Sequence, residues 1–173
     1  MSEESPKVVK ASPTKAPKTP KIHTLPTGAK ILHAKCKQVK EITPGVLELA
    51  HALEDYLRMH RDDELQPVGI SAPQLGKSIR VSSFILTPTA EPTTIINPEL
   101  VYEKKRHLVT ETCLSLPGKT FLLKRGKIAK MRGMLIDGSL RTFKGHGITA
   151  QIFLHELNHL DGITLDIIGE KIR

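Results

Sequence analysis

Residues 153–162 read Phe-Leu-His-Glu-Leu-Asn-His-Leu-Asp-Gly and contain the pattern His-Glu-x-x-His. On a helix, His155 and His159 would project from the same face, one turn apart, where both can bind one metal ion. Glu156 lies beside them, close enough to take a proton from a water on that ion. This stretch therefore predicts two metal ligands and a general base, and the third ligand must lie elsewhere in the chain.

The third ligand has candidates on both sides of this motif. Catalytic metal sites of this type have three protein ligands and one open position. Downstream of the motif, the chain offers Asp166 and Glu170. Upstream, Cys113 is the better candidate, because it lies among small residues beside Glu111 and a thiolate with two imidazoles is a reasonable ligand set. Cys36 lies among lysines and is interpreted as incidental.

Length and composition are typical of one soluble globular domain with a real core. The chain has 173 residues, of which 39% are hydrophobic and 25% charged. Two cysteines argue against a disulfide scaffold, and 3% aromatics argue against a surface that stacks on bases. No apolar run reaches the length of a membrane helix, and no signal-peptide core follows Met1.

The net charge of +8 comes mainly from the N-terminal part of the chain. Residues 1–40 contain nine lysines and two glutamates, so the remaining residues have a net charge of only +1. Residues 1–25 are rich in lysine and proline, and we predict that they form a disordered tail. Residues 26–173 are predicted to form the folded domain, and the near-neutral charge of its residues 41–173 gives no sign of nucleic-acid binding.

Two long helices are predicted from caps and apolar periodicity. Thr43 is a predicted N-cap with Pro44 at the first helical position, and apolar residues recur at helical spacing to about Met59. A second helix is expected to begin near Gly147, to carry the His-Glu-x-x-His pattern and to end at Gly162.

Between the helices, the sequence predicts several short strands and an α+β fold. Asn97-Pro98 is expected to end one strand, Lys104-Lys105-Arg106 to form a hairpin turn or exposed edge, and Asp137-Gly138 to form a hairpin turn. We expect antiparallel or mixed short sheets around the C-terminal helix. The predicted strands are residues 79–86, 93–96, 100–110, 121–123, 127–131 and 134–136.

Three separated motifs match one family in order and spacing. Residues 67–74, Pro-Val-Gly-Ile-Ser-Ala-Pro-Gln, match Gly-Φ-Gly-Φ-Ala-Ala-Pro-Gln, and residues 111–115, Glu-Thr-Cys-Leu-Ser, match Glu-Gly-Cys-Leu-Ser. Residues 154–162 match Gln-His-Glu-x-Asp-His-Leu-x-Gly. From about residue 26 to the end, the chain thus resembles peptide deformylase. The resemblance implies a metal-dependent hydrolase that removes the formyl group from the N-terminal formyl-methionine of new proteins and releases formate.

The resemblance also assigns roles to individual residues. Ferrous iron is the expected ion, with zinc, nickel or cobalt as alternatives, held by Cys113, His155 and His159. Glu156 would be the general base, and Gln74 with the N–H of Leu114 would hold the developing oxyanion. Residues that orient the ligands would be Glu111, Arg125 and Asn158. Residues that contact the substrate would be Val68, Gly69, Val109, Thr112 and Ile152, with Leu114 also against the methionine side chain.

Some residues depart from the family pattern without replacing a ligand, the base or the glutamine. Asn158 stands for Asp, Leu154 for Gln and Thr112 for Gly, while Gln151 and Thr120 lie where other members have different pocket residues. We expect them to lower activity or shift specificity. An inactive paralogue that binds blocked N-termini or ribosomes is the alternative, and a small His-Glu-x-x-His peptidase is a weaker one.

The resemblance implies a substrate but does not decide the role of the tail or the cellular compartment. The expected partners are N-formylated nascent peptides, and we expect a monomer without membrane contact. The basic tail is interpreted as a solvated extension, with ribosome contact as the alternative; a targeting role is less supported, because the tail has prolines and no arginine. A bacterial cytoplasm and a mitochondrial matrix both fit.

Overall fold

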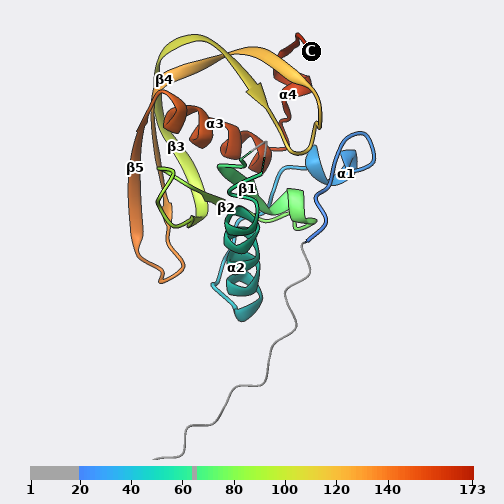
Figure 1. Ribbon diagram of the computed structural model, residues 1–173. Coiled ribbons are helices and arrows are strands. Elements are labelled where there is room, and N and C mark those ends of the chain that lie inside the picture. Colours follow the sequence, from blue (N-terminus) through green and yellow to red (C-terminus); the bar gives the residue numbers. More distant parts are fainter. Residues whose placement is uncertain (1–19, 64–65) are drawn as a thin grey trace, which may run out of the picture.

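The computed structural model describes residues 20–63 and 66–173, which form an α+β fold (Figure 1). No helix in these two ranges has the length and apolar character that crossing a membrane requires. In chain order the elements are α1 (Ala29–Leu32), α2 (Pro44–Met59), β1 (Gly69–Ser71), the 3₁₀ helix η1 (Ala72–Leu75), β2 (Val81–Phe84), β3 (Thr93–Thr112), β4 (Thr120–Met134), β5 (Leu140–His146), α3 (Ile148–Leu160), α4 (Leu165–Ile168) and β6 (Glu170–Lys171).

The described strands form one antiparallel sheet of six strands. Their order is β1-β2-β3-β4-β5, and β6 pairs with the start of β4. The strands β3 and β4 form a long hairpin whose pairing runs from Ile96 opposite Met134 to Thr112 opposite Thr120. Figure 1 shows this hairpin curling around one side of α3. The end of the hairpin therefore reaches α3, and β1 remains an edge strand near the same helix.

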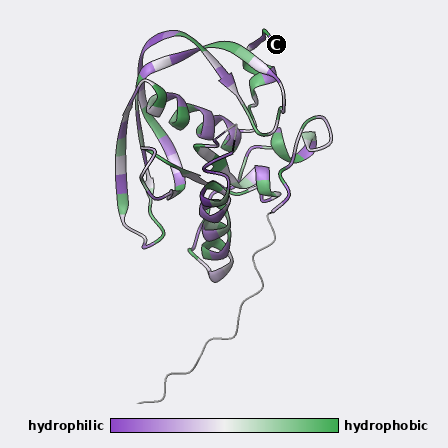
Figure 2. Ribbon diagram, in the orientation of Figure 1, coloured by the Kyte–Doolittle hydropathy of each residue, from purple (hydrophilic) through white to green (hydrophobic). Residues whose placement is uncertain are grey.

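The early helix α2 forms where the sequence predicts it. Thr43 is the N-cap, and its hydroxyl accepts a hydrogen bond from the N–H of Val46 at 3.4 Å. Pro44 occupies the first helical position, where its missing N–H costs no intrahelical bond. The helix carries both hydrophobic and hydrophilic residues (Figure 2), and its buried face includes the fully enclosed Leu53 and Leu57.

The late helix α3 also has the predicted bounds. It begins after Gly147 and ends before Gly162, whose φ of +73° favours glycine. A Cβ on Gly162 would lie 2.6 Å from the backbone oxygen of His33, so close packing also requires glycine here. The apolar face of α3 packs on the sheet, where Phe153 contacts Phe84 edge to face. This packing leaves the opposite face of α3 free for chemistry.

The prediction of short strands is wrong for the hairpin. β3 has 20 residues and β4 has 15. Asn97-Pro98 does not end a strand, and Lys104-Lys105-Arg106 is no hairpin turn, because both lie within β3. The alternative for the basic cluster, an exposed edge, is confirmed, since its three residues are exposed and this part of β3 pairs with β4 alone among the described strands. The positive φ values of Asn97 (50°) and Lys105 (57°) mark local irregularities that continued pairing with β4 accommodates. By contrast, the predicted turn at Asp137-Gly138 does connect β4 to β5, with Gly138 at φ 82°.

The start of the chain divides into two parts. Residues 1–19 of the predicted tail lie outside the described residues. Residues 20–25, also assigned to that tail, are hydrogen-bonded to the fold, so ordered structure begins before residue 26. The N–H of His23 donates to the backbone oxygen of Gln74 at 2.8 Å, and the N–H of Leu25 donates to that of Ser115 at 2.9 Å.

Candidate metal centre

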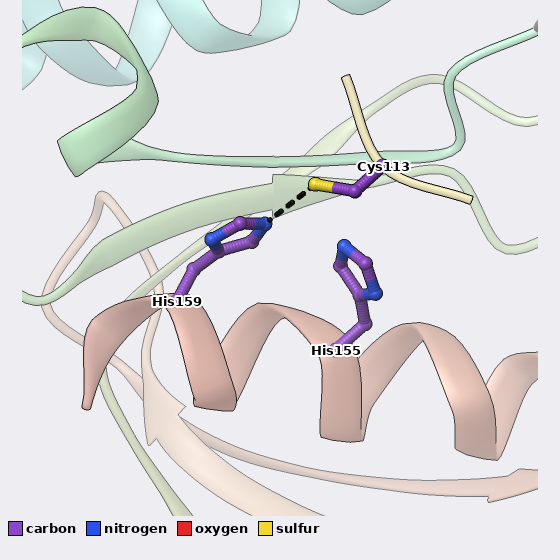
Figure 3. Close-up of side chains that lie close together, drawn as sticks. All are labelled: Cys113, His155 and His159. Atoms are coloured by element: carbon purple, nitrogen blue, oxygen red, sulfur yellow. Dashed lines mark hydrogen bonds between the residues drawn. The ribbon is translucent and has the colours of Figure 1, made fainter. Parts of the chain in front are cut away.

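Three side chains from two distant segments converge at one point beside α3. Cys113 follows the end of β3, while His155 and His159 project from α3 one turn apart (Figure 3). The Cys113 Sγ lies 3.2 Å from Nε2 of His159, and one potential ligand atom from each residue lies within 4.8 Å of the others. The sequence-predicted trio is therefore assembled by the hairpin that brings the end of β3 to α3.

The protonation of Cys113 suits metal binding. Burial of the thiol opposes ionisation, but the positive charges of His159 and His155 outweigh burial and lower the pKa of Cys113 well below its usual value. The thiolate is the form of cysteine that binds metals. Sulfur with two imidazole nitrogens is a ligand set that suits iron, zinc and similar divalent ions. The donor set thus fits the ion that the sequence motifs imply.

The downstream candidates for the third ligand do not reach this point. Within residues 20–63 and 66–173, the group of metal-binding side chains contains neither Asp166 nor Glu170. Asp166 instead accepts a hydrogen bond from the hydroxyl of Thr164, and Glu170 lines a second cavity behind α3. Of the alternatives that the residues alone left open, Cys113 is the one placed beside both histidines.

A chain of buried polar contacts holds His155 in place. Nδ1 of His155 donates to Glu111 at 3.0 Å, which leaves Nε2 to face Cys113. Both Glu111 oxygens accept from Arg125, each at 2.9 Å, and Arg125 also donates to the amide oxygen of Asn158. Burial alone would raise the pKa of Glu111, but the hydrogen bonds from His155 and Arg125 outweigh it and lower the pKa to about 2. Asn158 therefore still contacts Arg125, but as a neutral acceptor.

Replacing Arg125 tests this chain of contacts. We expect Arg125→Met to lower the free energy of unfolding by about 3–5 kcal/mol, because the buried Glu111 carboxylate would lose its guanidinium partner. Metal affinity should fall by about 10- to 100-fold, because Glu111 would then orient His155 less firmly. Urea unfolding and competition with a chelator would measure the two effects.

Arg132→Met is the matched control, since Arg132 lies on the same strand and also pairs with a glutamate. Its partner Glu99 lies 3.2 Å away, and both side chains are more than half exposed. Exposed pairs of this kind contribute about 0–1 kcal/mol. Equal losses of stability or of metal affinity in the two variants would contradict the role of Arg125.

Glu156 follows His155, one of the three candidate ligands, on α3 and is 3% exposed. Burial raises the pKa of Glu156, and the charges of His155 and His159 with a hydrogen bond from Ser71 offset part of this rise. A Cβ on Gly69 would lie 2.3 Å from Oε1 of Glu156. Close packing against the Glu156 side chain therefore requires glycine at position 69.

Gly69, Cys113, His155 and Glu156 line a pocket of about 560 Å³, and the predicted oxyanion donors lie on the same wall. Gln74 is 2% exposed, and its Nε2 donates to the Ser115 hydroxyl at 3.3 Å. Leu114 lies between Cys113 and Ser115, and no hydrogen bond to another residue of the described ranges uses its N–H. The donors that an oxyanion needs therefore border the same space as Cys113 and Glu156.

Most of the predicted substrate residues line this pocket, and one does not. Val68, Gly69, Thr112 and Ile152 are on its wall. Val109 packs instead against the apolar cluster that contains Cys113, so it supports that loop from behind.

The pocket also has lining residues that the sequence reasoning missed. Ile148 stands on the helix face of Ile152 and His155, so helical spacing could have found it. Lys119 lies in the loop between β3 and β4, and Arg173 follows β6, where its backbone oxygen accepts from the N–H of Thr120. No local sequence pattern identifies either residue as part of the pocket wall.

The departures from the family pattern fall into two places. Thr112, Gln151 and Thr120 line the pocket, where they can change which peptides fit. Leu154 faces the other way and packs with Ala129 and Ala150 in a small apolar cluster. The loss of a polar side chain at position 154 is therefore accommodated in the core.

Comparison with known proteins gives matches over most of the chain. The family model described as "Polypeptide deformylase" matches residues 21–170. A peptide deformylase of Desulforudis audaxviator is 37% identical over 134 residues, which cover 77% of this chain and 83% of that protein. One from Dehalococcoides mccartyi strain CBDB1 is 36% identical, with 77% of each chain covered.

Solved structures show the same similarity. The peptide deformylase of Thermotoga maritima superposes with a TM-score of 0.77 at 25% identity, covering 88% of this chain and 99% of that chain. The enzyme of Legionella pneumophila gives a TM-score of 0.78 at 27% identity, covering 87% of this chain and 86% of that chain.

Proposed function

The chain belongs to the peptide deformylase family, whose members remove the formyl group from the N-terminus of nascent peptides, and we propose a role in that reaction for each residue of the site. The resemblance seen in the three sequence motifs is thereby confirmed. The observation that carries the assignment of roles is the group of Cys113, His155 and His159, with Glu156 next to His155 on α3 and in the wall of the pocket that Cys113 and His155 also line.

We propose that Cys113, His155 and His159 hold one divalent ion, with Fe²⁺ preferred and Zn²⁺, Ni²⁺ or Co²⁺ as alternatives. When bound, such an ion polarises a carbonyl oxygen and lowers the pKa of water. Glu111 orients His155 through Nδ1, and Arg125 with Asn158 holds Glu111 in turn. Metal analysis of anaerobically purified protein tests the choice of ion, and a preparation active with zinc but not with iron would contradict it.

The catalytic steps then fall to groups that border the pocket. Glu156 would accept the proton released when water attacks the formyl carbon, and would return it to the leaving amine. A general base works best when its pKa lies near the working pH, and burial raises the pKa of Glu156 in that direction. As negative charge develops on the carbonyl oxygen, the amide of Gln74 and the N–H of Leu114 would donate hydrogen bonds to it. Both donors would come from the protein, and both residues already border the pocket.

The peptide itself would bind along β1. This strand pairs only with β2 within the described sheet, so its other edge can pair with an extended backbone at Gly69. Val68, Leu114 and Ile152 are three of the apolar side chains of the pocket wall, and they would surround the methionine side chain. Thr112 and Gln151 would lie beside the following residues and set which sequences fit.

We also propose where the protein acts. Protein synthesis that starts with formyl-methionine supplies the substrate, in a bacterial cytoplasm or alternatively a mitochondrial matrix, and the relatives named above are bacterial. We propose that the protein acts as a monomer and that its lysine-rich tail is a solvated extension, with ribosome contact as the alternative. Ribosome cosedimentation that is lost when the tail is deleted would favour the alternative.

The deciding experiment measures formate. Anaerobically purified, iron-loaded protein is incubated with formyl-Met-Ala-Ser, and we expect formate release well above that of the Glu156→Ala variant. Turnover no higher than that of the variant would favour an inactive paralogue that only binds blocked N-termini. Release of acetate from an acetylated peptide would instead redirect the substrate assignment.

A further inference from the structure

We propose that Ser71 is a positioning residue that fixes both the base Glu156 and the oxyanion donor Gln74. This inference deepens the proposed function and rests on it. Ser71 ends β1, begins η1 and is 0% exposed. It uses its hydroxyl for one catalytic side chain and its main-chain N–H for the other. No pattern in the sequence pointed to it, because the motif around it carries alanine at this position in the family.

The hydroxyl of Ser71 holds one oxygen of the Glu156 carboxylate. Its Oγ donates to Oε2 of Glu156 at 2.6 Å, and also lies 3.4 Å from the backbone oxygen of the same residue. A hydroxyl bonded to a carboxylate at this distance is a charge-assisted hydrogen bond, about twice as strong as a neutral one. Because Oε2 is occupied in this way, Oε1 is the oxygen left to exchange a proton with the substrate.

Gly69 lies on the same face of β1 as the Ser71 side chain and leaves room for Oε1, the second carboxylate oxygen of Glu156. Residues 69 and 71 lie two apart on a strand, so their Cβ positions point to the same side. At Gly69 a Cβ would lie 2.3 Å from Oε1 and 2.9 Å from Cδ of Glu156. The strand thus leaves space at residue 69 and supplies a donor at residue 71, and together these fix the rotation of the carboxylate.

The main chain of Ser71 fixes the amide of Gln74. Its N–H donates to Oε1 of Gln74 at 2.9 Å, which identifies that end of the amide as the oxygen. The other end, Nε2, therefore points to the Ser115 hydroxyl at 3.3 Å, in the loop that follows Cys113. An oxyanion needs N–H donors, and this orientation presents the NH₂ group to the side of the pocket where Leu114 also lies.

The two hydrogen bonds of Ser71 connect Glu156 and Gln74, which belong to different elements. Glu156 lies on α3 and Gln74 on η1, and both must face the same carbonyl group for the reaction to proceed. Small displacements of catalytic groups can lower rates by up to about a hundredfold. A buried residue bonded to both limits such displacements, and it can do so without touching the substrate.

The test compares Ser71→Ala with wild type in the iron-loaded protein, using formyl-Met-Ala-Ser. We expect kcat to fall roughly tenfold, because a hydrogen bond to a charged group is lost, while KM stays within about twofold and metal content is unchanged. Alanine is the family residue here, so the variant should fold. In the Glu156→Gln background, Ser71→Ala should cause no further loss, because Ser71 acts through Glu156.

Ser82→Ala is the matched control. Ser82 lies directly opposite Ser71 in the β1–β2 pair and is also 0% exposed, but its hydroxyl has no hydrogen-bond partner within the described residues. Its kcat should equal that of wild type.

Three outcomes would overturn the proposal. They are an unchanged kcat in Ser71→Ala, equal losses in the Ser71 and Ser82 variants, or a loss that appears only in KM. Absence of turnover in wild type would overturn the proposed function and this inference together, whereas an active wild type with an unaffected Ser71→Ala removes this inference alone.

Discussion

Replacing Glu156 with glutamine is expected to lower kcat for formate release by about a thousandfold while the metal stays bound. Glutamine keeps the shape of the side chain but cannot accept a proton, and general bases contribute roughly 10²- to 10⁴-fold. Glu156 is not part of the Cys113, His155 and His159 group, so the variant should retain its metal.

The same substitution should leave the fold intact or stabilise it. Burial raises the pKa of Glu156, which means that the pocket penalises its charged form, and a neutral amide avoids that penalty. Thermal unfolding of the two proteins would therefore separate a catalytic loss from a loss of structure. A melting temperature well below that of wild type would contradict this account of the carboxylate.

Glu54→Gln is the control for the Glu156 variant. Glu54 is also buried, at 8% exposure, but it lies on α2 and accepts a hydrogen bond from Thr94. Its replacement should not change kcat. If Glu156→Gln kept more than about a tenth of wild-type kcat, Glu156 would not be the base.

Replacing Cys113 with serine is expected to remove most of the bound metal and, with it, the activity. Serine preserves the size of the side chain, but its hydroxyl does not ionise at neutral pH, so the site loses its one anionic ligand. We expect less than half an ion per chain after dialysis, and a fall in kcat/KM of roughly a hundredfold or more. Metal analysis and the formate assay measure the two losses.

Cys36→Ser provides a control from the same chain, since Cys36 is likewise buried at 4% exposure. Burial raises the pKa of Cys36, so this residue remains a thiol, and it belongs to no cluster of potential ligands in the described ranges. Metal content and kcat/KM should match wild type. A Cys113→Ser variant that holds its ion as tightly as Cys36→Ser would show that the third ligand lies elsewhere.

The two long helices show what local sequence can determine. The bounds of α2 follow from Thr43 and Pro44 at one end and from apolar residues at helical spacing. The bounds of α3 follow from Gly147 and Gly162. Caps and apolar periodicity act within a few residues along the chain, so the bounds of a helix can be predicted from its own residues. The spacing of His155 and His159 is likewise a local feature of the sequence.

The long hairpin shows where local signals fail. Asn97-Pro98 and Lys104-Lys105-Arg106 look like ends and turns, yet β3 runs through both. The length of a strand depends on its partner, and β4 offers pairing along nearly the whole of β3. A register shift accommodates Asn97-Pro98, whereas Lys104 and Arg106 pair with β4 in unbroken register, because the hydrogen bonds gained on either side outweigh a local irregularity.

The sequence by itself determined the helices, the family motifs and the residue types that the chemistry needs. Only the tertiary structure decided which atoms meet. Gly69 is small because Glu156 lies against it, Asn158 still contacts Arg125, and the Ser71 hydroxyl donates to the Glu156 carboxylate. Each of these contacts joins segments far apart in the chain, so they are set by the pairing of β3 with β4 and the packing of α3. No local pattern encodes such distances.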